Sequence, residues 1–327
     1  MKKYWIILMV LTGILSTGLW KPAEAQPQTF KPDNLIQESF KDYNYIDTSY
    51  TFKFNEQTEK WGLHGRTLKY LGSKENPLLE LNQFYDSEGE TWKNDMRTIK
   101  SYDERGQEIQ TLKQDWNDNF KDWTHVTLKT ITYEGRKKSE ILYQEWMKPA
   151  GEWINSTLYL IDYNDEGNED MVVIKTYSVS TKTWNAETRY SFDYPAGLGK
   201  PDVAYVEKWL PAQKSWKRTG RYLLEHDFRG NKIMESRSTW NDIQDKWVHG
   251  LKFLMEYDKK LIKQEVQQRW NFKQEQWNNA KRNLYDYSEE GELKVETEQT
   301  WDKMANEWKT INKLMYSDIK DLEKMEG

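Results

Sequence analysis

Pairs of tryptophans recur along the chain at a fixed interval, and this repeat limits the fold more than any other feature. In residues 116–123, six mostly polar residues separate Trp116 from Trp123. The same spacing returns at Trp146/Trp153, Trp209/Trp216, Trp240/Trp247, Trp270/Trp277 and Trp301/Trp308, and with another aromatic residue first at Phe54/Trp61, Tyr85/Trp92 and Tyr177/Trp184. The second tryptophan of each pair returns every 30 to 32 residues. Such a period is typical of a repeat protein.

Each repeat has the composition of a β-hairpin. A tyrosine usually follows ten residues after the second tryptophan, and a Gly-containing turn follows the tyrosine, as in residues 102–106. The stretches between turns are nine or ten residues long and rich in Thr, Val, Ile, Tyr and Trp, which favours strands. We therefore predict an all-β protein, an antiparallel β-meander of about nine 31-residue hairpin repeats over residues 51–316. The long sheet must curve, either into an open superhelix or into a closed or nearly closed barrel.

Side-chain alternation assigns the aromatic columns to one face of this sheet. In a strand, residues an even number apart share a face. The tryptophan and tyrosine columns are ten residues apart, so we expect both on the same, concave face, with charged residues on the reverse. Across each hairpin the two tryptophans lie opposite each other, which predicts a ladder of aromatic pairs.

The two ends of the chain differ from the repeats. Residues 1–25 combine Lys2 and Lys3, an apolar run and an Ala-x-Ala site, which predicts a signal peptide cleaved after Ala25. The alternative is an uncleaved membrane anchor. Residues 26–50 are expected to be a leader and N-terminal cap, and residues 317–327 a charged tail with a short helix over 317–325. This reading predicts export to the periplasm or the extracellular space.

Composition narrows the chemistry. The chain has no cysteine, which excludes disulfides and thiolate metal sites. Its formal charge is −5, and the signal carries three lysines against one glutamate, so the mature part is mildly acidic. This charge gives no reason to expect nucleic acid as a partner. The four histidines fall in different repeats without metal-ligand spacing, so we expect no metal, no cofactor and no catalytic residues, hence a protein that is not an enzyme.

The paired tryptophans and the turn Tyr102-Asp103-Glu104-Arg105-Gly106 carry a family resemblance. Together with residues 116–123, this turn resembles secreted Tyr-Asp/Trp repeat proteins of Bacteroidota, many of them grouped as domains of unknown function. The resemblance covers residues 51–316. It implies a secreted all-β repeat protein and supplies no catalytic residues to transfer.

One column of residues distinguishes the middle repeats. The residue six positions after the second tryptophan is aromatic only there, at Tyr159, Tyr190, Tyr222 and Phe253, whereas the flanking repeats carry Thr67, Thr98, Lys129 and Asn283. With Trp184 and Trp216, these four residues are the candidate binding site for a glycan or an envelope protein. The alternative is that the aromatic side chains only thicken the core of the middle repeats.

The function expected from these features is a non-enzymatic secreted or periplasmic module that binds a ligand or has a structural role at the cell envelope. The alternatives are an outer-membrane β-barrel and, less favoured, an enzyme. Strict alternation in residues 308–315 leaves Lys309 and Lys313 on one face and Asn312 on the other, and the mean hydropathy is −1.00. A membrane barrel needs an apolar outward face, so we expect no stable membrane insertion of the mature chain.

Overall fold

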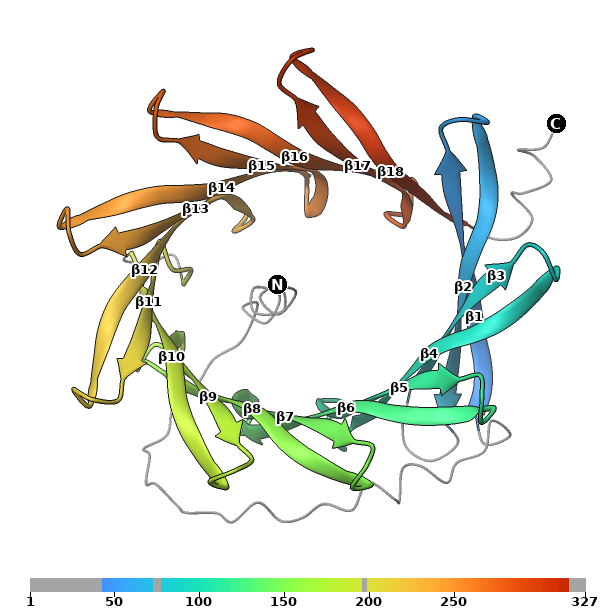
Figure 1. The fold of residues 1–327 in the computed structure, drawn as a ribbon, viewed down its shortest axis with the longest axis horizontal. Helices are drawn as coiled ribbons and strands as arrows, with labels where there is room; N and C mark the ends of the chain where they lie inside the picture. Colours follow the sequence, from blue (N-terminus) through green and yellow to red (C-terminus); the bar gives the residue numbers. More distant parts are fainter. Residues whose placement is uncertain (1–42, 73–77, 196–198, 318–327) are drawn as a thin grey trace.

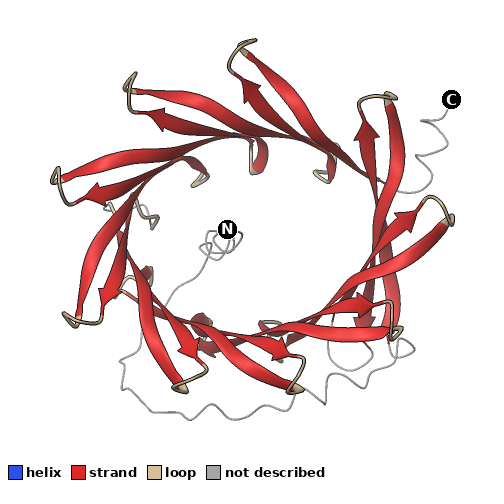
Figure 2. Cartoon of the chain, in the orientation of Figure 1, coloured by secondary structure: helices blue, strands red, loops and turns tan. Residues whose placement is uncertain are grey.

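The chain forms a single closed β-sheet. The computed structural model describes residues 43–72, 78–195 and 199–317, and these residues contain 18 antiparallel strands and no helix. Each strand pairs with its neighbours in sequence, and β1 (Tyr43–Asn55) also pairs with β18 (Glu307–Ser317), so the meander closes into a barrel (Figures 1 and 2). The predicted all-β meander is confirmed, and of the two predicted shapes the barrel is the one formed.

The strands follow the repeat. They are β1 (Tyr43–Asn55), β2 (Lys60–Gly72), β3 (Leu78–Asp86), β4 (Thr91–Tyr102), β5 (Glu108–Asn117), β6 (Asp122–Glu134), β7 (Lys137–Met147), β8 (Glu152–Tyr163), β9 (Glu169–Ser178), β10 (Thr183–Asp193), β11 (Val203–Leu210), β12 (Ser215–His226), β13 (Lys232–Asn241), β14 (Lys246–Asp258), β15 (Leu261–Asn271), β16 (Gln276–Tyr287), β17 (Leu293–Asp302) and β18 (Glu307–Ser317). Each of the nine hairpins therefore holds one aromatic pair. The signal peptide (1–25), the leader up to residue 42 and the helix expected after Ser317 lie outside the described residues. The described part of the chain holds no helix able to cross a bilayer.

The turn inside each hairpin has a repeated backbone conformation. The residue two positions before each second tryptophan has a positive φ, and only one of the nine is glycine: Glu59, Glu90, Lys121, Gly151, Lys182, Lys214, Asp245, Glu275 and Asn306. At the start of the turn an Asn or Asp side chain often accepts backbone N–H groups, as Asn117 Oδ1 does from Asn119 and Phe120. Such local bonds stabilise a turn without glycine.

The aromatic pairs lie directly across each hairpin, as predicted. Trp116 and Trp123 are register partners whose ring centroids are 5.1 Å apart at an interplanar angle of 68°. The other eight pairs have centroid distances from 4.9 to 5.3 Å. Edge-to-face pairs of this kind contribute roughly 0.5–1.5 kcal/mol beyond the burial of area. Nine such pairs fix the register of nine hairpins.

Every hairpin contains a β-bulge at the same place. In β6, His125 pairs with Gln114 and Thr127 pairs with Lys113, so Val126 is an extra residue. The equivalent shift occurs in the other eight hairpins, always at the third residue after the second tryptophan. One extra residue exchanges the two faces of the strand beyond it. The prediction that the tryptophan and tyrosine columns share a face is therefore wrong.

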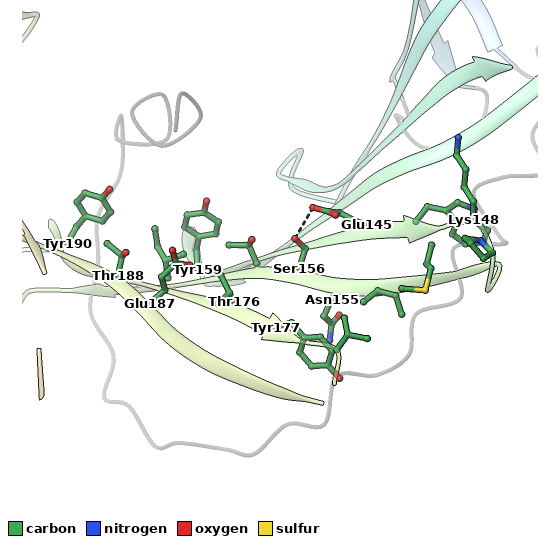
Figure 3. Close-up of a pocket in the computed structure, with 17 residues that line it drawn as sticks. Glu145, Lys148, Asn155, Ser156, Tyr159, Thr176, Tyr177, Glu187, Thr188 and Tyr190 are labelled. Carbon is green, nitrogen blue, oxygen red and sulfur yellow. Dashed lines mark hydrogen bonds between the residues drawn. The ribbon is translucent and has the colours of Figure 1, made fainter. Parts of the chain in front are cut away.

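The two columns point to opposite sides of the barrel wall. Figure 3 shows Tyr159 and Tyr190 directed into the barrel, whereas Asn155 and Tyr177, which share the tryptophan face, are directed outward. The tryptophans therefore line the outside of the barrel and not a concave face. The lumen is lined instead by the tyrosine column and by the residues six positions after each second tryptophan.

Strand registers set the width of the barrel. At eight junctions between hairpins, the fourth residue after a second tryptophan pairs with the residue just before the next aromatic pair, as Thr127 pairs with Glu145. At the closing junction Lys53 pairs with Leu314, two residues farther along. Each of the eight steps therefore shifts the register by two residues and the closing step by four, a shear of 20. These values give a strand tilt of about 37° and a radius of roughly 17 Å, too wide for side chains to fill.

A row of cations connects neighbouring hairpins on the outer face. The fifth residue after the second tryptophan is Arg or Lys in seven hairpins, and it stacks on an aromatic ring of the next hairpin at 4.4 to 5.3 Å: Arg66, Arg97, Arg189, Arg221, Lys252, Arg282 and Lys313. Leu128 and Leu158 take the remaining two positions, and Leu128 packs with Leu112 in an apolar cluster. The rings lie beyond the region where neighbouring hairpins share backbone pairs, whereas cations such as Arg97, which pairs with Gln114, lie inside it.

A polar ladder runs beside this row. The Nε of Arg97 donates to Gln114 Oε1 at 2.7 Å, and Gln114 Nε2 lies 2.9 Å from His125 Nδ1 across the hairpin. Arg66 and Arg282 make the same bond to the glutamine of the next hairpin, and Arg189 bonds to Glu207 at the equivalent position. Three of the five arginines of the row thus satisfy a glutamine of the following repeat, and Arg189 satisfies a glutamate.

Closure corrects the expectation about membranes. The expectation that the mature chain does not insert stably into a membrane is wrong, because the sheet is a closed barrel of 18 strands, the β architecture that satisfies all its backbone polar groups within a bilayer. Strict alternation in residues 308–315 is broken by the bulge at Ile311. The bulge places Lys313 and Met315 on the outer face with Trp308. The mean hydropathy averages the lumen-facing residues together with the outward-facing ones, so it does not describe the outer face.

Candidate binding site in the barrel lumen

Four of the six predicted site residues lie together on one wall of the lumen. Tyr159 of β8, Tyr190 of β10, Tyr222 of β12 and Phe253 of β14 occupy equivalent positions in successive hairpins, three residues beyond the bulge. Tyr159 contacts Tyr143 at 5.7 Å between ring centroids, and Tyr190 contacts Tyr222 at 6.3 Å. We call Tyr143, Tyr159, Tyr190, Tyr222 and Phe253 the aromatic belt.

The other two predicted residues are not part of this wall. Trp184 and Trp216 lie on the outer face, where each pairs across its own hairpin. The guanidinium of Arg189 lies 5.0 Å from the Trp216 ring and covers it. The bulge explains the separation, because Trp184 and Tyr190 are six residues apart in sequence yet lie on opposite faces.

The aromatic belt covers only part of the circumference. At the same height the other hairpins place Thr67, Thr98, Lys129, Asn283 and Leu314 in the lumen. Beside the belt, on the same face of the sheet, a buried cluster packs against the tyrosines: Ile131, Ile141, Ile161, Val172, Phe192 and Ala204. The lumen therefore has one aromatic wall and one polar wall, as the column of middle repeats predicts.

An arginine lies between two rings of the belt. The Arg237 guanidinium is 5.2 Å from the Tyr222 ring and 4.7 Å from the Phe253 ring. Its Nε donates to Glu235 Oε1 at 2.6 Å, and Glu235, 1% exposed, also accepts from Lys232 Nζ at 2.5 Å. Phe253 is thus covered, and this end of the belt presents a charged group. The alternation of Glu235 and Arg237 in the lumen-facing half of β13 was the sequence signal for it.

The opposite end of the belt borders a cavity of about 880 Å³. The cavity extends from the lumen wall at Tyr159 and Tyr190 into the gap where hairpins β7–β8 and β9–β10 diverge. Its polar lining includes Glu145, Ser156, Thr157, Thr176, Glu187 and Thr188 (Figure 3). Glu145 Oε1 accepts a hydrogen bond from Ser156 Oγ at 3.0 Å. Aromatic rings, hydroxyls and carboxylates thus meet at one place.

Burial raises the pKa of three phenols of the belt. Burial raises the pKa of Tyr143 to about 12, and burial together with the charge of Glu187 raises the pKa of Tyr159. Burial also raises the pKa of Tyr190, with a further contribution from Tyr222. At neutral pH each phenol therefore offers a hydrogen-bond donor beside an apolar ring, the combination that binds amphipathic ligands.

The tyrosine column has a structural role at the far rim of the lumen. The hydroxyls of Tyr133, Tyr163 and Tyr194 donate to the backbone carbonyls of Glu108, Lys138 and Glu169, each at the start of the other strand of the same hairpin. Burial raises the pKa of Glu169 to about 7. These bonds occupy the phenols of Tyr133, Tyr163 and Tyr194, so these three members of the column do not offer a free hydroxyl to a ligand.

Two of the four histidines pack against tryptophans. His125 and His249 lie on the outer face against the tryptophans of the next hairpin, at 4.7 Å from Trp146 and 4.8 Å from Trp270. Within residues 43–72, 78–195 and 199–317, no three His, Asp or Glu side chains gather in a way that could hold a metal ion.

Comparisons with known proteins give distant similarities. No family model matches the chain, and no curated protein matches it. Three solved structures from Bacteroides species are similar. A protein of unknown function from Bacteroides fragilis is 15% identical, with 41% of this chain and 94% of that chain covered and a TM-score of 0.35. A DUF3836 family protein from Bacteroides vulgatus is 14% identical over 29% and 91%, at 0.26. A porin-like protein from Bacteroides uniformis is 8% identical over 83% and 96%, at 0.39.

Similarities this distant carry no argument about function. Their source organisms agree with the resemblance to Bacteroidota proteins of unknown function. None of them tests the paired-tryptophan repeat itself.

Proposed function

We propose that this chain is a non-enzymatic β-barrel of the cell envelope that binds an extended glycan along the aromatic belt of its lumen. The observation that carries this proposal is the position of Tyr159 and Tyr190 beside a cavity lined by carboxylates and hydroxyls. Sugars present apolar ring faces and hydroxyl edges. Aromatic rings complement the former, and carboxylate and hydroxyl side chains complement the latter.

The width of the barrel supports an extended ligand. At a radius of roughly 17 Å, a single sugar chain can lie along one wall while water fills the rest. The belt crosses successive hairpins β7–β8 to β13–β14, so a chain of several sugar units contacts several rings. Repeated weak contacts of this kind favour polymers over monosaccharides through multivalency.

Glycan-array binding followed by titration calorimetry tests the proposal. The double variant Tyr159→Ala/Tyr190→Ala should bind any captured oligosaccharide at least about tenfold more weakly, which corresponds to roughly 1.4 kcal/mol. The matched control is Asn283→Ala, which changes the same row on the polar wall and should leave affinity unchanged. Absence of binding to any glycan, or equal losses in both variants, would overturn the assignment.

A second candidate is a barrel that spans the outer membrane, and closure of the sheet favours it. The outer face carries the tryptophans near one rim, and the residue seven positions after each second tryptophan is aliphatic in seven of nine hairpins: Leu68, Ile99, Leu160, Leu223, Leu254, Leu284 and Met315. Aromatic girdles beside apolar rows are features of membrane barrels. The row of stacked cations lies between them.

Conductance across planar lipid bilayers tests this second candidate. A spanning barrel of this width should give stepwise openings, and glycans that bind the belt should block the current. This candidate is excluded if alkaline carbonate releases the protein from membranes and no conductance is observed. Glycan binding is tested separately, by the array and calorimetry experiment.

A further inference from the structure

The hairpin tips at the tryptophan end expose apolar side chains in a repeated pattern. The tips are residues 55–60, 86–91, 117–122, 147–152, 178–183, 210–215, 241–246, 271–276 and 302–307. Six of the nine expose a large apolar side chain: Phe120, Met147, Val179, Ile243, Phe272 and Met304. Ile243 is 96% exposed and Met304 99%, which leaves their apolar surface fully in solvent. A soluble surface rarely repeats this arrangement without a partner.

The fold places these side chains on one ring. All nine hairpins enter the barrel in the same direction, and eight of the nine junctions share one register, so their tips project from the same rim. Figure 1 shows the tips radiating outward around that rim. The apolar tips belong to successive hairpins from β5–β6 to β17–β18, apart from residues 210–215, where Pro211 and Ala212 are exposed instead. The apolar surface is therefore an arc along the rim.

The chemistry of the arc fits a lipid surface. Its side chains are Phe, Met, Val and Ile, and they stand one to four residues after the first aromatic residue of the pair, so the tips share an apolar group but neither its position nor its shape. A fluid bilayer accepts apolar groups of any shape and position, whereas a protein partner selects both. The aromatic pair flanks each tip, and its nearer member stands one to three residues from the apolar side chain, within about 10 Å. Tryptophan prefers the headgroup region of a bilayer.

Charge on the tips separates the arc from the rest of the rim. The first two tips hold five carboxylates (Glu56, Glu59, Asp86, Glu88 and Glu90) against Lys60 and carry no large apolar side chain. The remaining seven tips hold eight carboxylates and seven lysines, so they are close to neutral. A neutral apolar arc needs no anionic lipid, because its affinity comes from apolar burial.

We propose that this arc of hairpin tips docks the barrel, rim first, on a lipid bilayer by shallow insertion of Phe120, Ile243, Phe272 and Met304. The inference concerns the outside of one rim and does not depend on what the lumen binds.

Flotation with phosphatidylcholine vesicles tests the proposal. The intact protein should float with the vesicles, and raising the salt concentration should change this little. The variant Phe120→Ser/Ile243→Ser/Phe272→Ser/Met304→Ser should partition at least about tenfold less, because four apolar side chains no longer leave water. The matched control is Phe228→Ser, since Phe228 is 91% exposed but lies in a turn at the opposite rim. It should float like the unaltered protein.

Further measurements distinguish a loss of membrane binding from a loss of folding. All four tip residues are exposed, so the quadruple variant should keep the far-UV circular dichroism and thermal midpoint of the parent, and the double variant Ile243→Ser/Met304→Ser should give an intermediate loss. The proposal is overturned if the parent does not float, if the quadruple variant floats equally well, or if the tip substitutions abolish only a rim-to-rim dimer in size-exclusion chromatography.

Discussion

Arg97 stacks its guanidinium on Trp123 of the following hairpin at 4.7 Å while its Nε donates to Gln114 of that same hairpin. One side chain thus covers an aromatic ring and satisfies an amide that is 2% exposed. The hairpins share no backbone pairs at the level of the tryptophans, because pairing begins with Met96 and Asp115. Contacts of this kind therefore position each tip against the next.

Replacing Arg97 with alanine should lower the unfolding free energy by about 2 kcal/mol. The substitution removes a cation–π contact of roughly 0.5–1 kcal/mol and a charged hydrogen bond of roughly 1.5–3 kcal/mol to a buried amide. Arg97→Leu copies the natural Leu128 and Leu158 and should cost less, because the aliphatic side chain still covers the ring. Thermal and urea unfolding followed by circular dichroism measures both, and equal losses would contradict a role for ring coverage.

Deleting the bulged residue Ala280 should disrupt the fold far more than substituting it. Without Ala280, every side chain of β16 beyond Asn279 must exchange faces or β16 must slip against β17, at a cost on the order of several kcal/mol. Ala280→Gly keeps the residue count and should retain most of the stability. Size-exclusion chromatography and thermal melting compare the two, and a deletion variant that melts like the parent would refute the assignment of faces.

Cysteines at the closing junction should report closure directly. Lys53 and Leu314 are register partners between β1 and β18, and the natural chain has no other cysteine to interfere. Lys53→Cys/Leu314→Cys should form a disulfide under mild oxidation, visible as a mobility change on non-reducing gels.

A second cysteine pair tests the register of the closing junction. Lys53→Cys/Asn312→Cys places the second cysteine where the register of the other eight junctions would put it, and it should crosslink poorly. Efficient crosslinking of the Asn312 variant in place of the Leu314 variant would show that the closing junction is not shifted and that the shear is not 20.

Glu169 should make stability depend on pH. Burial raises its folded pKa from 4.5 to about 7, so between these values the folded state binds more protons than the unfolded state. The unfolding free energy should therefore fall as pH rises from about 4.5 through 7, and the loss should be complete above that range. Glu169→Gln should flatten the dependence and be the more stable form at pH 8, as thermal midpoints from pH 4 to 8 can measure. An unchanged pH profile would contradict the shift.

A glycine should suit the hairpin turns better than the natural residues do. Glu275 has a φ of 50°, a conformation that costs a non-glycine residue about 1–2 kcal/mol. Glu275→Gly should stabilise the protein by up to about 1 kcal/mol after the entropy lost by glycine is counted. Gly151→Ala, at the equivalent place with φ 63°, should destabilise it by a similar amount. Urea midpoints compare the two variants, and changes of the same sign would contradict this account.

Much of the lumen site was readable in the sequence. The aromatic column at Tyr159, Tyr190 and Tyr222 stands out because equivalent residues elsewhere are polar, and the structure places that column on one wall. The cavity beside it required coordinates, because Glu145 and Glu187 come from different hairpins that diverge at their tips. The arginine row was visible as well, since Arg or Lys recurs five residues after seven of the nine second tryptophans. The contacts of this row could be assigned only from the coordinates, because each cation stacks on a ring of the neighbouring hairpin.

The sequence by itself determined the local units: nine hairpins, their turns and the partner of each tryptophan, because these depend on residues a few positions apart. Tertiary structure decided the rest. Whether β1 meets β18 depends on tilt and twist accumulated over the whole sheet, to which each hairpin adds only a small part. Which side the tryptophans face depends on one unpaired residue per hairpin, and an even spacing of ten conceals it. One bulged residue in each hairpin therefore places the tryptophan column outside the barrel and the tyrosine column in the lumen.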